Sequence, residues 1–508
     1  MSNPMERLLE LSREIGHLGD IISLLNWDQE TGGMPPDGAE ARASQIALMQ
    51  GRLHERLVSK ELGDLVQQLW DKRATLSPEN AANVREIRRS YLQETRLPAE
   101  LVTEMAHTQA LAHHAWIDAR KKSDFAAFAP WLEKIFGLKK RQAEALGYPD
   151  GEPYNALLDL FESGVKVSQL NPLFEKLRSE QVPIVKAIQT APRRPNESLL
   201  TRRVPADKQR AFAYQVALDM GFEEKGGVLA ISAHPFCSGM GAGDVRITTR
   251  YNEVEPLSSF TGVMHETGHA LYEQGVDRAQ AGTPMGRTVS LGIHESQSRS
   301  WENMVGRSLP FWKHYFPKLQ KAWAPVYDDV KLEDFHFAVN LVKPSMIRVE
   351  ADEVTYNLHI LVRYEIERDL FAGKLTVNDL PKAWNAKMQQ YLGITPKNDA
   401  EGVLQDVHWS AGLIGYFPTY TLGNLYGAQL FDAARKAIPD LDERLARGDL
   451  RTLREWQREH IHKLGCLHEP ADLVKAITGK APDSGYYIGY LNDKFGPLYG
   501  IHGGVGAR

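Results

Sequence analysis

The sequence predicts a mainly α-helical protein with one small β-sheet. Apolar residues recur at helical spacing along most of the 508-residue chain. Proline stands near the first turn of several expected helices, as at Pro78 and Pro98, and glycine follows the last turn of others, as at Gly147 and Gly275. Strand signals are confined to one stretch. These observations favour helices as the main building element.

We expect helices along most of the chain, with boundaries good to about four residues. In chain order they cover residues 5–26, 39–57, 59–72, 78–94, 98–122, 124–146, 153–162, 167–191, 205–220, 258–274, 294–306, 345–371, 379–393, 420–436, 440–446, 450–463 and 469–478.

The sheet is expected immediately before the helix at 258–274. Residues 244–251 alternate β-branched and polar side chains, and residues 227–232 carry a weaker signal of the same kind. A strand edge beside a cleft can pair with an extended peptide. A plain structural hairpin explains the pattern equally well, and both interpretations stay open.

Composition excludes several classes of protein. Hydrophobic residues make up 43% of the chain, charged residues 25%, and the net charge is −5. These values are ordinary for a globular protein and lack the basic character of nucleic-acid binding. The chain has two cysteines, Cys237 and Cys466, so we expect no disulfide and a cytoplasmic location.

The organisation predicted is a single domain over residues 1–508, with two helical lobes around a cleft. No internal repeat, low-complexity tract or long linker interrupts it. The N-terminus lacks the pattern of a secretory signal, and no apolar run of 18 residues predicts a membrane span. From their number and position, the helices of residues 1–75 are expected to form a lid.

The most informative motif is His265-Glu266-Thr267-Gly268-His269, an H-E-x-x-H pattern inside an expected helix. Residues four apart lie on one helical face, so His265 and His269 can direct their rings to one point. Neutral imidazole is a preferred zinc ligand. Glu266 lies beside them, where it can reach a water molecule activated by the ion. The motif therefore predicts metal-assisted hydrolysis of an amide bond.

A third protein ligand is expected because catalytic zinc usually has three. Glu295 is the best candidate, from a second helix packed against the first. Glu273, His294 and Glu302 compete with it. Glu273 would require distorted geometry, and His294 is expected to face elsewhere if its segment is helical.

The motifs together resemble the carboxypeptidase Taq family of metallocarboxypeptidases over nearly the whole chain. The residues that carry the resemblance are Trp27-Asp28-Gln29-Glu30, Met34-Pro35-Pro36, Tyr154-Asn155-Ala156-Leu157-Leu158, His234-Pro235-Phe236, Asp244-Val245-Arg246-Ile247-Thr248, the H-E-x-x-H motif, His294-Glu295-Ser296-Gln297 and Gly402-Val403-Leu404-Gln405-Asp406-Val407-His408-Trp409.

The resemblance implies a helical fold with a deep central groove, similar to neurolysin-like and peptidyl-dipeptidase-like enzymes. It implies release of single residues from the free C-termini of peptides, with broad specificity. It also implies one divalent ion per chain, Zn²⁺ or Co²⁺, and a homodimer.

We assign roles to further residues on chemical grounds and by analogy. Glu266 is expected to act as general base and then general acid. The tetrahedral oxyanion needs a hydrogen-bond donor, and His408 and Tyr420 are the candidates by analogy with related deep-groove peptidases. Asp406 could orient a histidine. Each of these residues could instead be a hydrogen-bonded core residue.

An exopeptidase must also bind the terminal carboxylate of its substrate. Arg348, expected early in the helix at 345–371, is the best candidate because a guanidinium can hold a carboxylate with two hydrogen bonds. The resemblance also favours it. His234 could assist, and Arg246 could reach the groove from its strand, although it could simply pair with Asp244.

Other functions remain as alternatives at this stage. An oligoendopeptidase or dipeptidyl carboxypeptidase could use the same metal helix. A non-catalytic peptide-binding scaffold is disfavoured by the intact set His265, Glu266, His269 and Glu295. A structural helical protein with a fortuitous motif would contain no metal.

Overall fold

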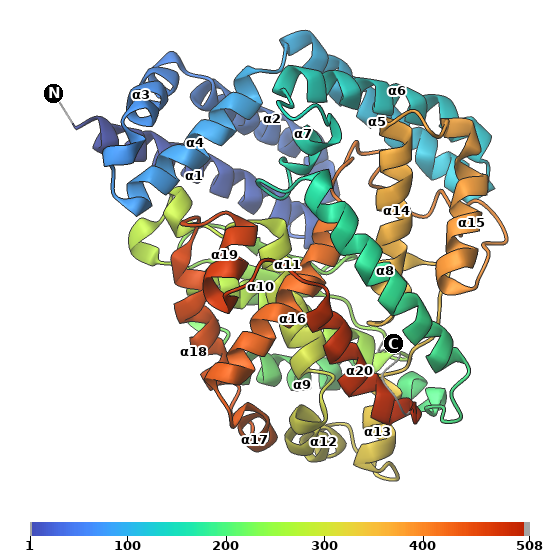
Figure 1. The fold of residues 1–508 in the computed structure, drawn as a ribbon. Coiled ribbons are helices and arrows are strands. Elements are labelled where there is room, and N and C mark those ends of the chain that lie inside the picture. Colours follow the sequence, from blue (N-terminus) through green and yellow to red (C-terminus); the bar gives the residue numbers. More distant parts are fainter. Residues whose placement is uncertain (1–2, 502–508) are drawn as a thin grey trace.

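Helices build most of the molecule in the computed structural model, which describes residues 3–501 (Figure 1). The helices are α1 (Pro4–Glu30), α2 (Ala39–Leu57), α3 (Lys60–Asp71), α4 (Pro78–Thr95), α5 (Ala99–Lys122), α6 (Phe125–Leu146), α7 (Tyr154–Leu158), α8 (Val167–Gln189), α9 (Ala206–Met220), α10 (Pro256–Gly275), α11 (Leu291–Arg299), α12 (Leu309–Ala322), α13 (Leu332–Val339), α14 (Tyr356–Phe371), α15 (Leu380–Leu392), α16 (Pro418–Ala437), α17 (Leu441–Arg447), α18 (Arg451–His460), α19 (Pro470–Thr478) and α20 (Gly485–Tyr499). The predicted helical fold class is confirmed.

The sheet has three strands in the order β1-β3-β2. Strands β1 (Gly227–Ile231) and β3 (Val245–Thr249) run parallel, and β2 (Cys237–Gly239) pairs antiparallel to β3. The two expected strands are present. Strand β2 was not expected, because three residues are too few to show alternation. β3 packs against α10, so the sheet supports the helix that carries the H-E-x-x-H motif.

Among the described residues, the buried apolar side chains form two separate hydrophobic clusters. The main core draws on helices from α5 to α20 and on the sheet. A smaller cluster joins α1, α3 and α4 through buried side chains such as Leu8, Leu62 and Val84. These N-terminal helices lie together at one corner of the molecule (Figure 1). They therefore form a small lobe with its own core, next to the main body.

Three helices, α12, α13 and α20, were missed by the sequence prediction. α12 and α20 contain internal prolines, Pro317 and Pro497, which lower helix propensity. All three nevertheless bury aromatic residues, including Trp312, Phe335 and Phe495. Tertiary burial therefore outweighs local propensity in these segments.

The helix predicted at 345–371 is wrong in its first part. α14 begins only at Tyr356, and a single 3-10 turn covers Arg348–Glu350. The Asp352 carboxylate accepts hydrogen bonds from the backbone N–H groups of Val354 and Thr355, at 2.9 and 3.0 Å. Such side-chain bonds compete with helical hydrogen bonding. Arg348 consequently lies in an irregular segment before α14.

Helix α11 lies between α10 and α16 and continues into a π-helical turn, η7 (Ser300–Val305). Two glycines permit this close packing. A Cβ atom at Gly268 would lie 2.7 Å from Cα of Ser298, and one at Gly423 would lie 2.5 Å from Cγ of Glu295. The absence of side chains at these positions brings Glu295 of α11 towards the two histidines of α10.

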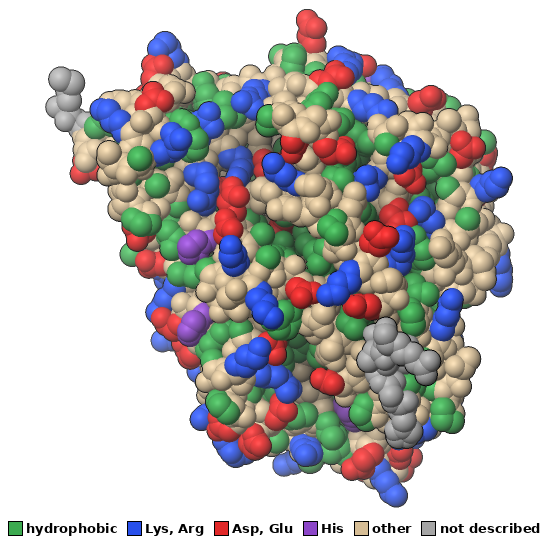
Figure 2. Space-filling view, viewed as in Figure 1, with side chains coloured by type: hydrophobic (Ala, Val, Ile, Leu, Met, Phe, Trp, Pro, Cys, Tyr) green, Lys and Arg blue, Asp and Glu red, His purple; other side chains and the backbone are tan. Residues whose placement is uncertain are grey.

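The surface view shows Lys and Arg side chains interspersed with Asp and Glu over this face of the molecule (Figure 2). Across residues 3–501, none of the helices is both long and apolar enough to cross a membrane.

Candidate active site

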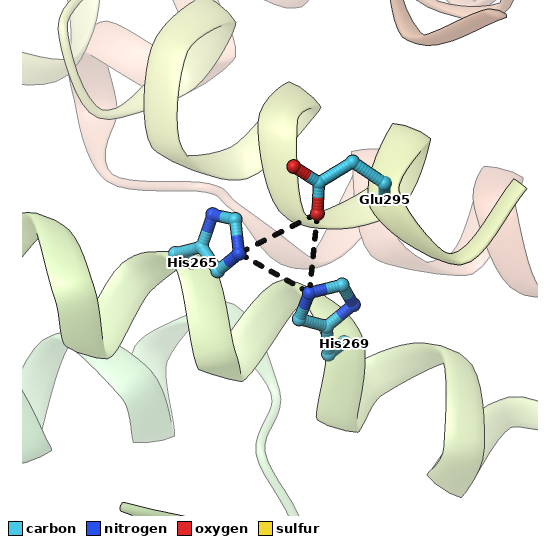
Figure 3. Close-up of side chains that lie close together, drawn as sticks. All are labelled: His265, His269 and Glu295. Atoms are coloured by element: carbon cyan, nitrogen blue, oxygen red, sulfur yellow. Dashed lines mark hydrogen bonds and ion pairs between the residues drawn. The ribbon is translucent and has the colours of Figure 1, made fainter. Parts of the chain in front are cut away.

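Three predicted metal-ligating side chains converge between α10 and α11 (Figure 3). Nε2 of His269 lies 3.2 Å from Nε2 of His265, and Oε2 of Glu295 lies 3.5 Å from the first nitrogen and 3.6 Å from the second. Two atoms that bind one tetrahedral zinc ion at about 2.1 Å are about 3.4 Å apart. The donor types and their separations therefore fit a divalent metal.

A partly buried arginine, Arg299, and a second carboxylate, Glu302, contact this cluster on the side away from the candidate metal position. Oε2 of Glu302 lies 2.9 Å from Nδ1 of His265, on the side of the ring away from His269 and Glu295. Arg299 donates hydrogen bonds to Oε1 of Glu295 at 2.6 Å and to Glu302 at 3.1 Å. Burial would raise the pKa of Glu295, but Arg299 and His265 hold it well below the ordinary carboxyl value. Glu295 therefore stays an anion.

His269 has a different support, which corrects the expectation that His294 faces elsewhere. Nδ1 of His294 lies 2.5 Å from Nδ1 of His269, and its Nε2 lies 2.8 Å from Oε1 of Glu273. Glu273, His294 and His269 thus form a chain of polar contacts. His294 and Glu302, which competed as ligands in the sequence analysis, contact the outer ring nitrogens of the two histidines instead.

A further carboxylate, missed by sequence reasoning, fixes the start of α11. The buried Glu162 accepts hydrogen bonds from Oγ of Ser290 at 2.9 Å and from the backbone N–H of Gly292 at 2.7 Å. Helix N-termini leave backbone donors without partners and favour negative charge. Glu162 therefore satisfies the first turn of the helix that carries Glu295. No local pattern around Glu162 marks this role.

Glu266 lies in the wall of a large cavity. Its side chain is almost completely buried, and burial raises its pKa to about 7. The cavity has a volume of about 1140 Å³, and its wall includes both His265 and Glu266. A carboxyl group in this environment can exchange a proton near neutral pH.

The same cavity wall contains four of the other predicted site residues, namely His234, Arg348, His408 and Tyr420. Nε2 of His408 lies 3.4 Å from the hydroxyl of Tyr420. The Arg348 guanidinium lies 5.2 Å from the centre of the Tyr420 ring and donates to the Tyr356 hydroxyl at 3.0 Å. Side chains from segments far apart in the sequence are thus brought to one surface.

Arg246 is not among the residues of this wall. Its guanidinium donates two hydrogen bonds to Asp244, at 2.8 and 2.7 Å, and lies over the ring of Trp27. The structure therefore places Arg246 between β3 and α1, paired with Asp244, which was the expected alternative to substrate binding.

A helix with an H-E-x-x-H motif, a carboxylate from a neighbouring helix and a groove beside them are typical of metallopeptidases. The family model described as carboxypeptidase Taq (M32) metallopeptidase matches residues 7–495. The chain therefore belongs to the carboxypeptidase Taq (M32) family, as the motifs predicted. Members of this family are hydrolases that act on peptide bonds.

Relatives and solved structures agree with this assignment. The chain is 44% identical to thermostable carboxypeptidase 1 of Thermus thermophilus, covering 97% of this chain and 99% of the relative. It is 40% identical to carboxypeptidase 1 of Bacillus subtilis, with 97% and 98% covered. The fold matches the crystal structure of the M32 carboxypeptidase from Deinococcus radiodurans with a TM-score of 0.94, at 40% identity and with 98% and 100% covered.

Proposed function

We propose that the protein is a zinc-dependent carboxypeptidase that releases single residues from the free C-termini of peptides, with broad specificity. The observation that carries this proposal is the shared cavity. The cavity has a volume of about 1140 Å³, and its wall contains His265 of the metal cluster, the neighbouring Glu266 and the buried Arg348. A peptide lying in this cavity can present its last amide bond to Glu266 and its terminal carboxylate to Arg348.

The metal is proposed to be held by His265, His269 and Glu295. When bound, a divalent ion supplies a Lewis acid that polarises the scissile carbonyl and activates water. Zinc is our first choice because two imidazoles and one carboxylate are a frequent catalytic zinc set, and cobalt is the alternative. Glu302 and His294 would orient the two ligand rings through their outer nitrogens.

Glu266 would take a proton from the attacking water and deliver it to the departing amine. Its pKa of about 7 suits both directions of transfer at neutral pH. His408 and Tyr420 would donate hydrogen bonds to the developing oxyanion. Burial lowers the pKa of His408 to about 4, so its ring is neutral and keeps one N–H to donate.

Arg348 would hold the terminal carboxylate of the substrate. Its guanidinium is buried beside aromatic rings, where an ionic hydrogen bond is stronger than in water. His234, in the same wall, would contact the peptide. For Arg246, the pairing with Asp244 favours a role in holding the strand against α1 over direct substrate contact.

The test is a mass-spectrometric time course on one peptide as the free acid and as the C-terminal amide, with and without a chelator. We expect stepwise loss of single C-terminal residues from the acid, abolished by chelation and suppressed in the amide. Internal cuts in both peptides would assign an oligoendopeptidase, and release of residue pairs would assign a dipeptidyl carboxypeptidase. No cleavage by the zinc-loaded protein would assign a binding scaffold.

The variant that tests the role of Arg348 is Arg348→Met, which keeps much of the side-chain volume and removes the charge. We expect kcat/KM on the acid to fall by roughly 100-fold or more, since a buried charged hydrogen bond is lost. Activity on the amide should change far less. Equal losses on both peptides would remove Arg348 from the proposed role.

Two structural proposals accompany the activity. We propose that residues 1–508 act as one catalytic domain, with the helices of residues 1–75 serving as a lid beside the body. The ends of this range, residues 1–2 and 502–508, lie outside the described residues. We also propose a homodimer on the strength of the family likeness, which sedimentation equilibrium would test.

A further inference from the structure

The carboxylate of Asp406 lies between two guanidinium groups. Arg348 donates from Nε to one oxygen at 2.9 Å, and Arg363 donates from Nε to the other at 2.6 Å, with its Nη2 in an ion pair 2.5 Å from the same oxygen. Gln405 joins the group, because its Oε1 accepts from the backbone N–H of Arg348 at 2.8 Å and from Nη2 of Arg363 at 2.7 Å. The three charged side chains therefore form one fixed unit.

The two arginines have different access to the substrate. Arg348 lies in the wall of the cavity that contains Glu266. The side chain of Arg363, on α14, is 0% exposed and is absent from that wall. Arg363 stacks on Trp384 at 4.5 Å and so faces the protein interior. Only Arg348 can touch a peptide, and any effect of Arg363 on substrate must pass through Asp406.

The ionisation of the unit leaves it with one net positive charge. Burial lowers the pKa of Arg363 only to about 10, so it remains charged at neutral pH. Burial would raise the pKa of Asp406, but Arg363 and Arg348 hold it well below the ordinary carboxyl value. The neighbouring His408 ring is neutral. Two cations and one anion therefore remain.

Removing Arg363 from this unit would change its charge. Arg348 and Asp406 alone would form a neutral pair, with Asp406 competing for the same guanidinium that must meet the substrate. The carboxylates of Asp352 and Glu350, which also lie in the cavity wall, do not compete with Asp406 for the Arg348 guanidinium. Asp352 is occupied by the backbone N–H groups of Lys343, Val354 and Thr355, and Glu350 is exposed to solvent.

We propose that Arg363 is a positioning residue that neutralises Asp406 from the interior side. The unit of Arg348, Asp406 and Arg363 then keeps one net positive charge, which Arg348 presents to the terminal carboxylate of the peptide. This inference rests on the proposed function, because it requires Arg348 to bind that carboxylate. Asp406 fixes the guanidinium of Arg348 in place, and Arg363 prevents that fixing group from cancelling the charge of Arg348.

The experiment compares the wild type with Arg363→Gln, Asp406→Asn and the double variant R363Q/D406N, all loaded with zinc. The readout is the ratio of kcat/KM on a peptide acid to that on its amide. We expect R363Q to lower this ratio by about tenfold or more, mainly through KM on the acid. D406N should keep a preference for the acid, because two cations then remain.

The double variant distinguishes charge from structure. In the double variant Arg348 is the one charged group left in the unit, so the unit again has a net charge of +1. We therefore expect its acid-to-amide ratio to rise above that of R363Q. A purely structural role for Arg363 predicts a double variant no better than R363Q, and that outcome would overturn the proposal, as would an unchanged ratio in R363Q. A wild type that does not prefer the acid would refute the proposed function instead.

Two further variants guard against simple loss of folding. Arg363→Lys keeps a cation beside Asp406 and loses the forked geometry, so its acid-to-amide ratio should lie between those of the wild type and R363Q. A loss as large as that in R363Q would contradict the proposal. Arg368→Gln is the matched control, because Arg368 lies on the same helix and bonds to Asn171 away from the cavity. Its ratio should equal that of the wild type.

Discussion

Oε2 of Glu302 lies 2.9 Å from Nδ1 of His265, which leaves Nε2 of that ring directed at His269 and Glu295. The contact selects the tautomer in which Nδ1 carries the proton and Nε2 is free to bind a metal. Glu302 belongs to the π-helical turn that follows α11. A π-helical turn rotates the following side chains relative to a regular helix, and such turns are frequent at functional sites.

We predict that Glu302→Ala weakens metal binding by about 10- to 100-fold, the range found when groups that orient metal ligands are removed. Competition with a chromophoric chelator measures this affinity directly. Glu302→Gln should lose less, because its amide oxygen can still accept from His265. Glu350→Ala, a change to an exposed carboxylate in the same cavity wall, is the control and should bind metal like the wild type. Unchanged affinity in Glu302→Ala would remove Glu302 from this role.

Gly423 on α16 gives a second, purely steric prediction. A methyl group at this position would lie 2.5 Å from Cγ and 2.6 Å from Cβ of Glu295. Because helix backbones on both sides limit adjustment, Gly423→Ala should displace the Glu295 carboxylate. We expect metal affinity to fall by tenfold or more and stability to fall by about 1–3 kcal/mol, as for overpacked cores.

The control for Gly423 is Gly137→Ala in the middle of α6, where an added Cβ meets nothing within 4 Å. That change should stabilise the protein by up to about 1 kcal/mol through the unfolded chain. Metal titration and chemical unfolding of the two variants give both quantities. Wild-type metal affinity in Gly423→Ala would show that Glu295 is not held by this packing.

The sequence predicted the metal cluster better than its surroundings, and the reason is the range of the interactions. His265 and His269 are four residues apart, so helical geometry alone brings them together. Glu295 was found because a third ligand was required, and its helix was recognisable. Arg299, Glu162 and Glu302 act through tertiary contacts or a local π-helical turn, which no periodic pattern reports. Their roles could not be assigned from residue type alone.

Arg348 illustrates the opposite case, where the residue was selected for its chemistry while its local structure was predicted incorrectly. The apolar spacing of residues 345–371 favours one helix, but the side-chain hydrogen bonds of Asp352 delay its start to Tyr356. In the irregular segment, Arg348 can reach Asp406, 58 positions further along the chain. Such a long-range ion pair leaves no local signal in the sequence.

For the proposed base, we predict that Glu266→Gln binds zinc but turns over peptide about 10²- to 10⁴-fold more slowly, the range of general base catalysis. The isosteric amide preserves the packing of this buried side chain and cannot accept the proton. Metal content and kcat, measured on the same preparation, separate the two effects. Glu255→Gln, immediately before the same helix, should keep both. Substantial turnover by metal-loaded Glu266→Gln would exclude this residue as the base.

The buried Glu162 carboxyl group should make the free energy of unfolding depend on pH, independently of peptide hydrolysis. Burial raises the pKa of its carboxyl group from 4.5 to about 7 in the folded protein. The folded state then binds this proton more tightly than the unfolded state does. The stabilising contribution is complete below about pH 4.5 and is lost as the pH rises to about 7. At full extent it amounts to about 3 kcal/mol.

Glu162→Gln carries no proton to lose, while its amide oxygen can still accept a hydrogen bond at the start of α11. We therefore predict that the free energy of unfolding of the wild type falls relative to that of Glu162→Gln between about pH 4.5 and pH 7. Urea unfolding of both proteins at matched pH and zinc concentration measures the difference. Metal-linked and histidine-linked effects are common to the two proteins and cancel. A constant difference across this range would show that the Glu162 carboxylate is ionised throughout, stabilised by the backbone N–H of Gly292 and the hydroxyl of Ser290.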